Sequence, residues 1–99
     1  MNITELPFKC PVAPLEFIFL ADWWLQEQGL REDTELTFVT PLPGAFTKPV
    51  ASKALGGMLE EKKIGLVSDF NIEQVDLDAN KIVAYSEEEV DYDLLVSVP

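Results

Sequence analysis

The chain has 99 residues, of which 18 are acidic and 7 are basic, so its formal net charge is −11. A chain of this length forms one small domain with a modest core, and its acidic surface would repel nucleic acids and anionic lipid headgroups. It contains no histidine and only one cysteine, Cys10. This composition excludes an internal disulfide and a histidine-dependent triad, and it argues against any metal site of the zinc type. We find neither a signal peptide nor an apolar run long enough to span a bilayer, and we expect a cytoplasmic protein.

The first strand and the first helix are predicted at residues 2–4 and 14–28. Pro14 suits a first helical turn, and Gly29 suits the position just after the last turn. The predicted helix is apolar on nearly every side, apart from a narrow polar edge that includes Asp22. Because such a helix is normally covered on more than one side, we expect its aromatic side chains to pack against another part of a longer chain or against a second copy. The candidate interface residues are Phe17, Trp23 and Trp24.

A second strand, a second helix and a third strand are predicted at residues 36–39, 49–62 and 64–67. Thr47 is the candidate N-cap of this helix. The Gly56-Gly57 pair in the middle of the helix predicts close packing there, and the third strand has the apolar character of a buried strand. The expected inner face of the helix comprises Val50, Ala51, Leu55, Met58 and Leu59.

The spacing of the apolar residues changes after residue 70 from the helical pattern to the alternation of a strand. Residues 70–77 alternate, with one irregularity near Gln74 that predicts a β-bulge, and strands at 81–86 and 89–92 would complete an antiparallel meander. Residues 94–98 form a continuous apolar run, which is typical of a strand buried in a parallel sheet. The order β-α-β-α-β, meander and final strand predicts a Rossmann-like three-layer α/β domain with a mainly parallel sheet and two helices.

The turn before the first helix occupies the place where a dinucleotide-binding domain carries its glycine-rich loop. Cys10, Val12 and Leu15 stand where the three glycines would be, and no acidic residue follows the second strand to bind a ribose. Both findings argue against NAD(P) binding. Cys10 is next to Lys9 and just ahead of a helix N-terminus, which favours a nucleophilic thiolate. The alternative is that Cys10 is a small buried residue at the end of a strand.

Three stretches resemble the flavin-dependent sulfide:quinone oxidoreductases, which are related to flavocytochrome c sulfide dehydrogenase and type II NADH dehydrogenases. These are PFKCPVAPLEFIFLADWWLQEQGL, ELTFVTPLPGAFTKPVASKALGGMLEEKKI and VDYDLLVSVP. The most specific element is the pattern of Cys10, Ala13, Pro14 and Glu16. The resemblance covers essentially the whole chain but only the middle of such a protein. It implies that residues 1–99 are a degenerate NAD(P)-binding-like domain, excised from a larger two-domain flavoprotein.

The resemblance also implies a function. Cys10 would be a redox cysteine that faces FAD and bridges, as a disulfide or polysulfide, to a second cysteine outside this sequence. Electrons would pass from sulfide through FAD to quinone. The turn residues Pro11, Val12, Ala13 and Pro14 would lie near the flavin.

The partner implied by the resemblance is the FAD-binding domain of the same full-length chain, which would be peripheral on the membrane. The isolated domain would bind no FAD and would be inactive. One departure is that several family members carry a histidine in the loop where this chain has Phe46, Thr47 and Lys48.

Two other interpretations are open. The chain could be a domain of an NADH:quinone or flavocytochrome c sulfide dehydrogenase-type flavoprotein in which Cys10 is incidental. It could also be a non-catalytic interaction domain or homodimer that pairs through Phe17, Trp23 and Trp24.

Overall fold

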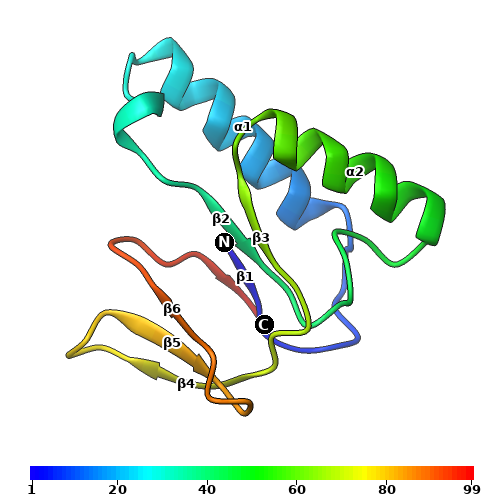
Figure 1. Ribbon diagram of the computed structural model, residues 1–99, viewed down its shortest axis with the longest axis vertical. Coiled ribbons are helices and arrows are strands. Elements are labelled where there is room, and N and C mark those ends of the chain that lie inside the picture. Colours follow the sequence, from blue (N-terminus) through cyan, green and yellow to red (C-terminus); the bar gives the residue numbers. More distant parts are fainter.

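The computed structural model describes all 99 residues and has three layers (Figure 1). The middle layer is a four-stranded parallel sheet in the order β3-β2-β1-β7. Its strands are β1 (Asn2–Ile3), β2 (Thr37–Val39), β3 (Gly65–Val67) and β7 (Ser97–Val98).

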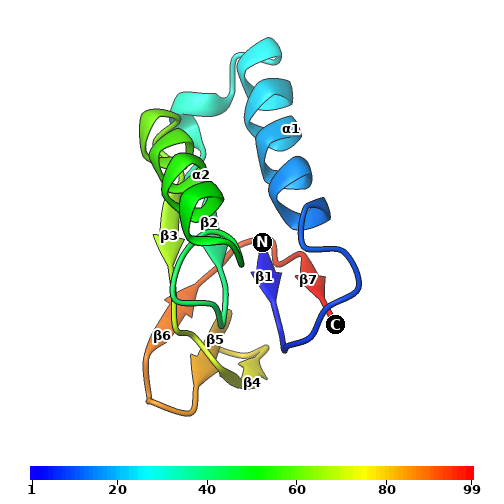
Figure 2. The ribbon, with the colours of Figure 1, turned by 90° about the vertical axis from the view of Figure 1, so that its right-hand side faces the viewer.

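Two helices, α1 (Ala13–Glu27) and α2 (Pro49–Glu61), cover one face of this sheet, as Figure 2 shows. The other face is covered by a three-stranded antiparallel sheet in the order β4-β5-β6. Its strands are β4 (Ile72–Asp76), β5 (Lys81–Ala84) and β6 (Glu89–Asp91). The predicted Rossmann-like three-layer fold is therefore confirmed.

The parallel sheet is apolar on both faces because a different layer covers each. Phe38 packs with Ile3 and the helix residues Leu15, Ile18 and Leu59. The next residue, Val39, belongs to a second core with Phe70, Ile82 and Ala84 on the side of the meander. Successive side chains of a strand point to opposite faces, so neighbouring residues of β2 serve two different cores.

Helix α1 ends as its sequence predicts. Gly29 has φ +70°, its N–H donates to the carbonyl of Gln26 at 3.1 Å, and the N–H of Leu30 donates to the carbonyl of Leu25 at 2.8 Å. These are the two hydrogen bonds of a Schellman motif, in which glycine suits the left-handed position. The turn that follows contains a short 3-10 helix, η1 (Arg31–Asp33), which the sequence pattern did not predict.

Several expectations for α2 are wrong. The residue at the N-cap is Lys48 and not Thr47, and no side chain caps the helix. Val50 is 86% exposed, and Met58 is also exposed, because the helix meets the core mainly through Leu59. Gly56 and Gly57 do not mark close packing, since a Cβ built at either position meets no atom within 4 Å.

The strands agree with the predictions in order but not always in burial. The meander forms with the expected irregularity, because the β4–β5 register shifts between Ile72 and Gln74. Strand β3 is not buried, because it forms the edge of the parallel sheet. The last strand does pair in parallel with β1, but it is limited to β7, and Leu94 is exposed on the segment that connects the meander to the sheet.

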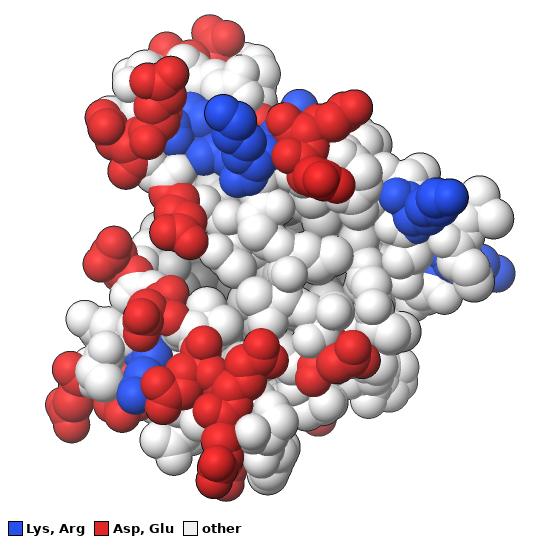
Figure 3. Space-filling view, in the orientation of Figure 1, with Lys and Arg blue, Asp and Glu red and all other residues white.

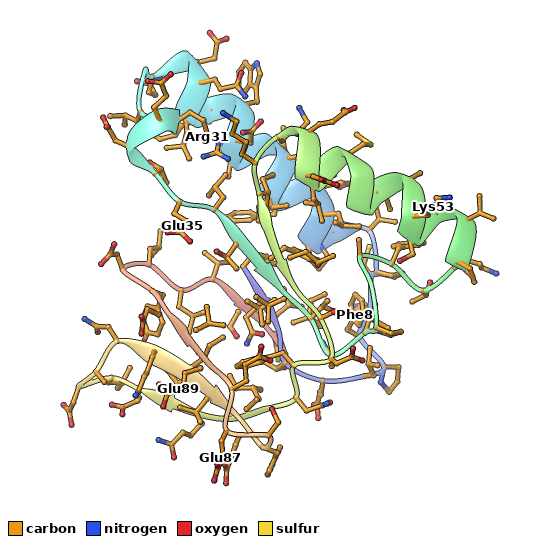
Figure 4. All side chains as sticks on the ribbon, viewed as in Figure 1. Phe8, Arg31, Glu35, Lys53, Glu87 and Glu89 are labelled. Atoms are coloured by element: carbon orange, nitrogen blue, oxygen red, sulfur yellow. The ribbon has the colours of Figure 1, made fainter.

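Charge is unevenly distributed over this fold. Acidic side chains gather over the antiparallel sheet on the face drawn in Figure 3. Basic side chains on this face lie chiefly at the far end of the helices from that sheet, around Arg31, and near the start of α2 (Figures 3 and 4).

Asp22 and Arg31 form an ion pair in which the carboxylate is buried and the guanidinium partly exposed, and we call it the Asp22–Arg31 clamp. Asp22, expected on the polar edge of α1, is only 1% exposed. Its carboxylate accepts hydrogen bonds from Arg31 Nε at 2.6 Å and from Gln26 Nε2 at 2.8 Å. The same guanidinium donates to the carbonyls of Lys62 at 2.7 Å and Lys63 at 3.1 Å. The clamp therefore ties α1 to the end of α2, and its groups are used within the chain.

We expect Gly29→Ala to destabilise the fold by about 1 kcal/mol, because alanine is strained in the left-handed conformation. Gly56→Ala should instead stabilise it by about 0.5–1 kcal/mol, since the position is helical and faces open space. Urea unfolding followed by circular dichroism measures both changes. A loss of stability in Gly56→Ala would show that this face of α2 is packed after all.

We expect Arg31→Met to lower the free energy of unfolding by about 3 kcal/mol, because it leaves the Asp22 carboxylate buried without its main partner. Lys53→Met, at an exposed position of α2, is the matched control and should change stability by less than about 0.5 kcal/mol. If the two substitutions changed the free energy of unfolding in urea equally, the clamp would make no contribution to stability.

Candidate functional site

Cys10 lies in the loop that joins β1 to α1, beyond the carboxyl end of the parallel strands. In Figure 1 this loop runs below the sheet and returns to the start of α1. The thiol is free and exposed, so the interpretation of Cys10 as a small buried residue is wrong. The reason is that the chain moves outward after β1, contacts the core through Phe8, and is fully buried again only at Pro14 and Leu15. In open α/β sheets, ligands bind at this end of the strands.

Contacts on both sides of Cys10 hold the loop. Thr4 Oγ1 donates to the carbonyl of Val98 at 2.9 Å, which fixes the loop where it leaves β1. Phe8, labelled in Figure 4, is half-buried against the core on the helix side. No side chain caps α1, whose N-cap residue is Val12. The N–H groups of Ala13 and Leu15 in the first turn therefore have no side-chain cap, whereas Pro14 has no N–H and Glu16 already places a carboxylate in this turn.

The turn does not fit a nicotinamide dinucleotide. Residues 4–28 contain no glycine, so the backbone cannot approach a pyrophosphate as a glycine-rich loop does. The position after β2, where an acidic residue would bind ribose, is occupied by Thr40, which is buried. The Thr40 N–H donates to the carbonyl of Val67 at 2.9 Å, and its own carbonyl accepts from the N–H of Phe70 at 3.0 Å. These groups hold the loop together and are not free for a ligand.

A flavin would find only part of a binding site here. The residues that the turn exposes are Cys10, Val12 and Ala13, whereas Pro14, in the first turn of α1, is buried. Phe46 packs against the core, and Thr47 and Lys48 are exposed on the other loop at this end of the sheet. The chain can thus present a thiol to a flavin that is held by another domain, but it offers no phosphate-binding loop of its own.

The aromatic residues of α1 that we expect to form an interface lie uncovered within this chain. Phe17, Trp23 and Trp24 are 46%, 58% and 52% exposed. Phe17 and Trp24 line an apolar groove of about 470 Å³, whereas Trp23 does not. This groove lies at the amino end of the parallel strands, opposite to Cys10. The sequence did not reveal it, because its other wall is built by residues 90–96, which are brought there only by the fold.

The structure contains neither a metal-binding cluster nor a membrane-spanning helix. No group of three or more histidine, cysteine, aspartate or glutamate side chains is arranged to hold a metal ion. Neither helix has the length and apolar character needed to cross a membrane.

The chain matches no protein-family model and no curated protein sequence. Among solved structures, it is similar to the sulfide:quinone oxidoreductase of the hyperthermophilic bacterium Aquifex aeolicus, with a TM-score of 0.80 and 14% identity over 99% of this chain and 24% of that chain. It is also similar to a chain of the mitochondrial ATP synthase of Tetrahymena thermophila, with a TM-score of 0.70 and 24% identity over 98% of this chain and 26% of that chain. The chain spans about a quarter of the length of both, and these likenesses establish a shared fold.

Proposed function

We propose that the chain is the second, Rossmann-like domain of a flavin-dependent oxidoreductase of the sulfide:quinone oxidoreductase type, and that Cys10 is its redox thiol. The observation that carries this proposal is the exposed thiol in the β1–α1 loop, beyond the carboxyl end of the parallel strands. The pattern of Cys10, Ala13, Pro14 and Glu16 supports it, as does a likeness in fold to the Aquifex enzyme over 99% of this chain.

The chemistry follows from the thiol. Hydrosulfide adds to one sulfur of a disulfide between Cys10 and a second cysteine, the S–S bond breaks, and the other sulfur leaves as a thiolate that holds the electron pair. Sulfide is thereby oxidised to a cysteine-bound sulfur atom, while the disulfide is reduced. FAD would supply a two-electron acceptor that passes the pair on to quinone. Because Cys10 is the only cysteine here, the second one must be provided from outside residues 1–99.

Basic groups lie near this loop, although Glu5 in the loop and Glu16 in the first turn of α1 are acidic and the chain as a whole is acidic. Lys9 is adjacent to Cys10 and exposed, and the uncapped N-terminus of α1 follows directly. The start of α2, at the same end of the sheet, adds its N-cap residue Lys48 and also Lys53, which is labelled in Figure 4. Hydrosulfide carries one negative charge and would be attracted to this end.

The partner in this proposal is the FAD-binding domain of the same full-length protein. It would pack at the carboxyl end of the parallel strands, where Cys10 is exposed. The missing glycines and the buried Thr40 fit an enzyme that takes its electrons from sulfide and not from a nicotinamide cofactor. The isolated 99-residue chain should accordingly bind no FAD and show no activity.

We expect Cys10→Ser, introduced into the full-length protein, to lower sulfide-dependent quinone reduction by about 100-fold or more, because removal of a reacting nucleophile abolishes its step. The visible spectrum of the bound flavin should be unchanged, which separates lost chemistry from lost structure. Val50→Ala, at a position that is 86% exposed on α2, is the control and should keep full activity.

Undiminished sulfide oxidation by Cys10→Ser would refute the role of this thiol. If that variant also oxidised NADH at the wild-type rate, the protein would instead belong with the NADH:quinone or flavocytochrome c type flavoproteins. A nicotinamide-dependent activity would also contradict our inference that the β1–α1 turn does not bind a nicotinamide dinucleotide.

A second candidate function is that of a non-catalytic interaction domain. It is supported by the uncovered aromatic side chains of α1 and by the likeness in fold to a chain of an assembled ATP synthase. The two candidates place the function at opposite ends of the parallel sheet. Activity that is lost with Cys10 favours the first, whereas a phenotype caused only by substitutions at Phe17 or Trp24 favours the second.

A further inference from the structure

The apolar groove at the amino end of the parallel strands has two walls. One is helix α1, which contributes Phe17, Trp24 and Leu25, and the other is the segment from β6 to β7, which contributes Val90 and Leu94. The starts of β1 and β2 lie between them. Of the 21 residues that line the groove, 14 are hydrophobic. An uncovered groove with two large aromatic side chains is typical of an interaction site.

The charged side chains that line this groove are all acidic. They are Asp33, Glu35, Asp91 and Asp93, and no lysine or arginine is among them. Glu35 is labelled in Figure 4, and Figure 3 shows acidic side chains on both sides of the hollow in this region. The only cationic group is the α-amino group of Met1, which donates to the Thr37 carbonyl at 3.0 Å and whose pKa is lowered by burial. The groove is thus apolar inside and negative around its edge.

Asn2, which also lines the groove, carries an unsatisfied acceptor. Its side chain is completely buried, and its Nδ2 donates to Ser97 Oγ at 3.3 Å. Its Oδ1 has no hydrogen-bond partner, and an unpaired buried acceptor is unfavourable. Because this oxygen is buried, an occupant of the groove would not reach it, and the acceptors that meet N–H donors of an occupant are the four exposed carboxylates.

We propose that this groove binds a basic amphipathic helix of another protein. Large apolar side chains of the helix would fill the groove between Trp24 and Leu94, and flanking lysine or arginine side chains would pair with the four carboxylates. A second copy of this chain fits poorly, because it would bring another net charge of −11 and the same acidic edge against the first. The groove is at the opposite end of the sheet from Cys10, so this inference does not depend on the proposed redox function.

The probe is a synthetic amphipathic peptide of leucine and lysine, about 18 residues long so that it forms several helical turns. A matched peptide carries glutamate in place of every lysine. The chain has two tryptophans, so Trp23→Phe leaves Trp24 as the only fluorophore of this kind. We expect the lysine peptide to shift the Trp24 emission to shorter wavelength in a saturable way, with an affinity that falls as salt is added. The glutamate peptide should have no effect.

Variants of the chain test the two parts of the groove separately. Trp24→Ala should weaken binding of the lysine peptide by about tenfold or more, and Trp23→Ala by less than about twofold, because only Trp24 lines the groove. The double change Glu35→Gln with Asp93→Asn should weaken binding and reduce its salt dependence. The control pair Glu87→Gln with Glu88→Gln, in the exposed turn after β5, should leave both unchanged. Calorimetric titration measures all four variants, and thermal unfolding verifies that each is folded.

Three results would overturn the proposal. The first is equal binding of the lysine and glutamate peptides, or no binding of either. The second is an equal loss of affinity in Trp23→Ala and Trp24→Ala. The third is self-association of the chain that depends on Trp24 in sedimentation without peptide, which would assign the groove to a second copy.

Discussion

The parallel sheet can be as small as it is only because both of its faces are covered. Its strands contain two or three residues each, so the few buried side chains of the inner strands have to supply both cores. Phe38 packs against the helices and Val39 against the meander, and the parallel arrangement buries both. The Asp22–Arg31 clamp then fixes the end of α2 against α1. The two faces of the sheet are used by the fold, and only its two ends are left for function.

The two ends differ in chemistry. The carboxyl end exposes a thiol beside Lys9 and the uncapped start of α1, which suits a reaction with an anionic sulfur species. The amino end offers an apolar groove with an acidic edge, which suits a basic partner. Under our two proposals, the domain contributes a reacting group to a flavin at one end, and another polypeptide binds at the other. Neither use requires the glycine-rich loop that nucleotide-binding relatives of this fold carry.

Much of the architecture could be predicted from the sequence because it depends on local patterns. Residues that are close together in the sequence determine the spacing of the apolar side chains, the end of α1 at Gly29 and the irregularity near Gln74. The wrong predictions concern burial, which depends on the element that packs against a residue. Val50 and Met58 were expected in the core but are exposed to solvent. Asp22 was expected on a polar edge but is buried beside Arg31. The position of Cys10 before a helix identified it as a candidate site residue, but the sequence did not predict whether its thiol is exposed. The groove could not be predicted, because its walls come from residues 17–25 and 90–96.

The most direct test of the proposed redox role is to trap the sulfur chemistry on Cys10. The full-length protein is exposed to sulfide without oxygen, alkylated, and digested, and the peptide that contains Cys10 is weighed by mass spectrometry. The proposal predicts that this peptide carries added sulfur or is joined to a second cysteine peptide by a sulfur bridge. A Cys10 that is recovered only as the simple alkylated thiol, while the protein continues to oxidise sulfide, would contradict it.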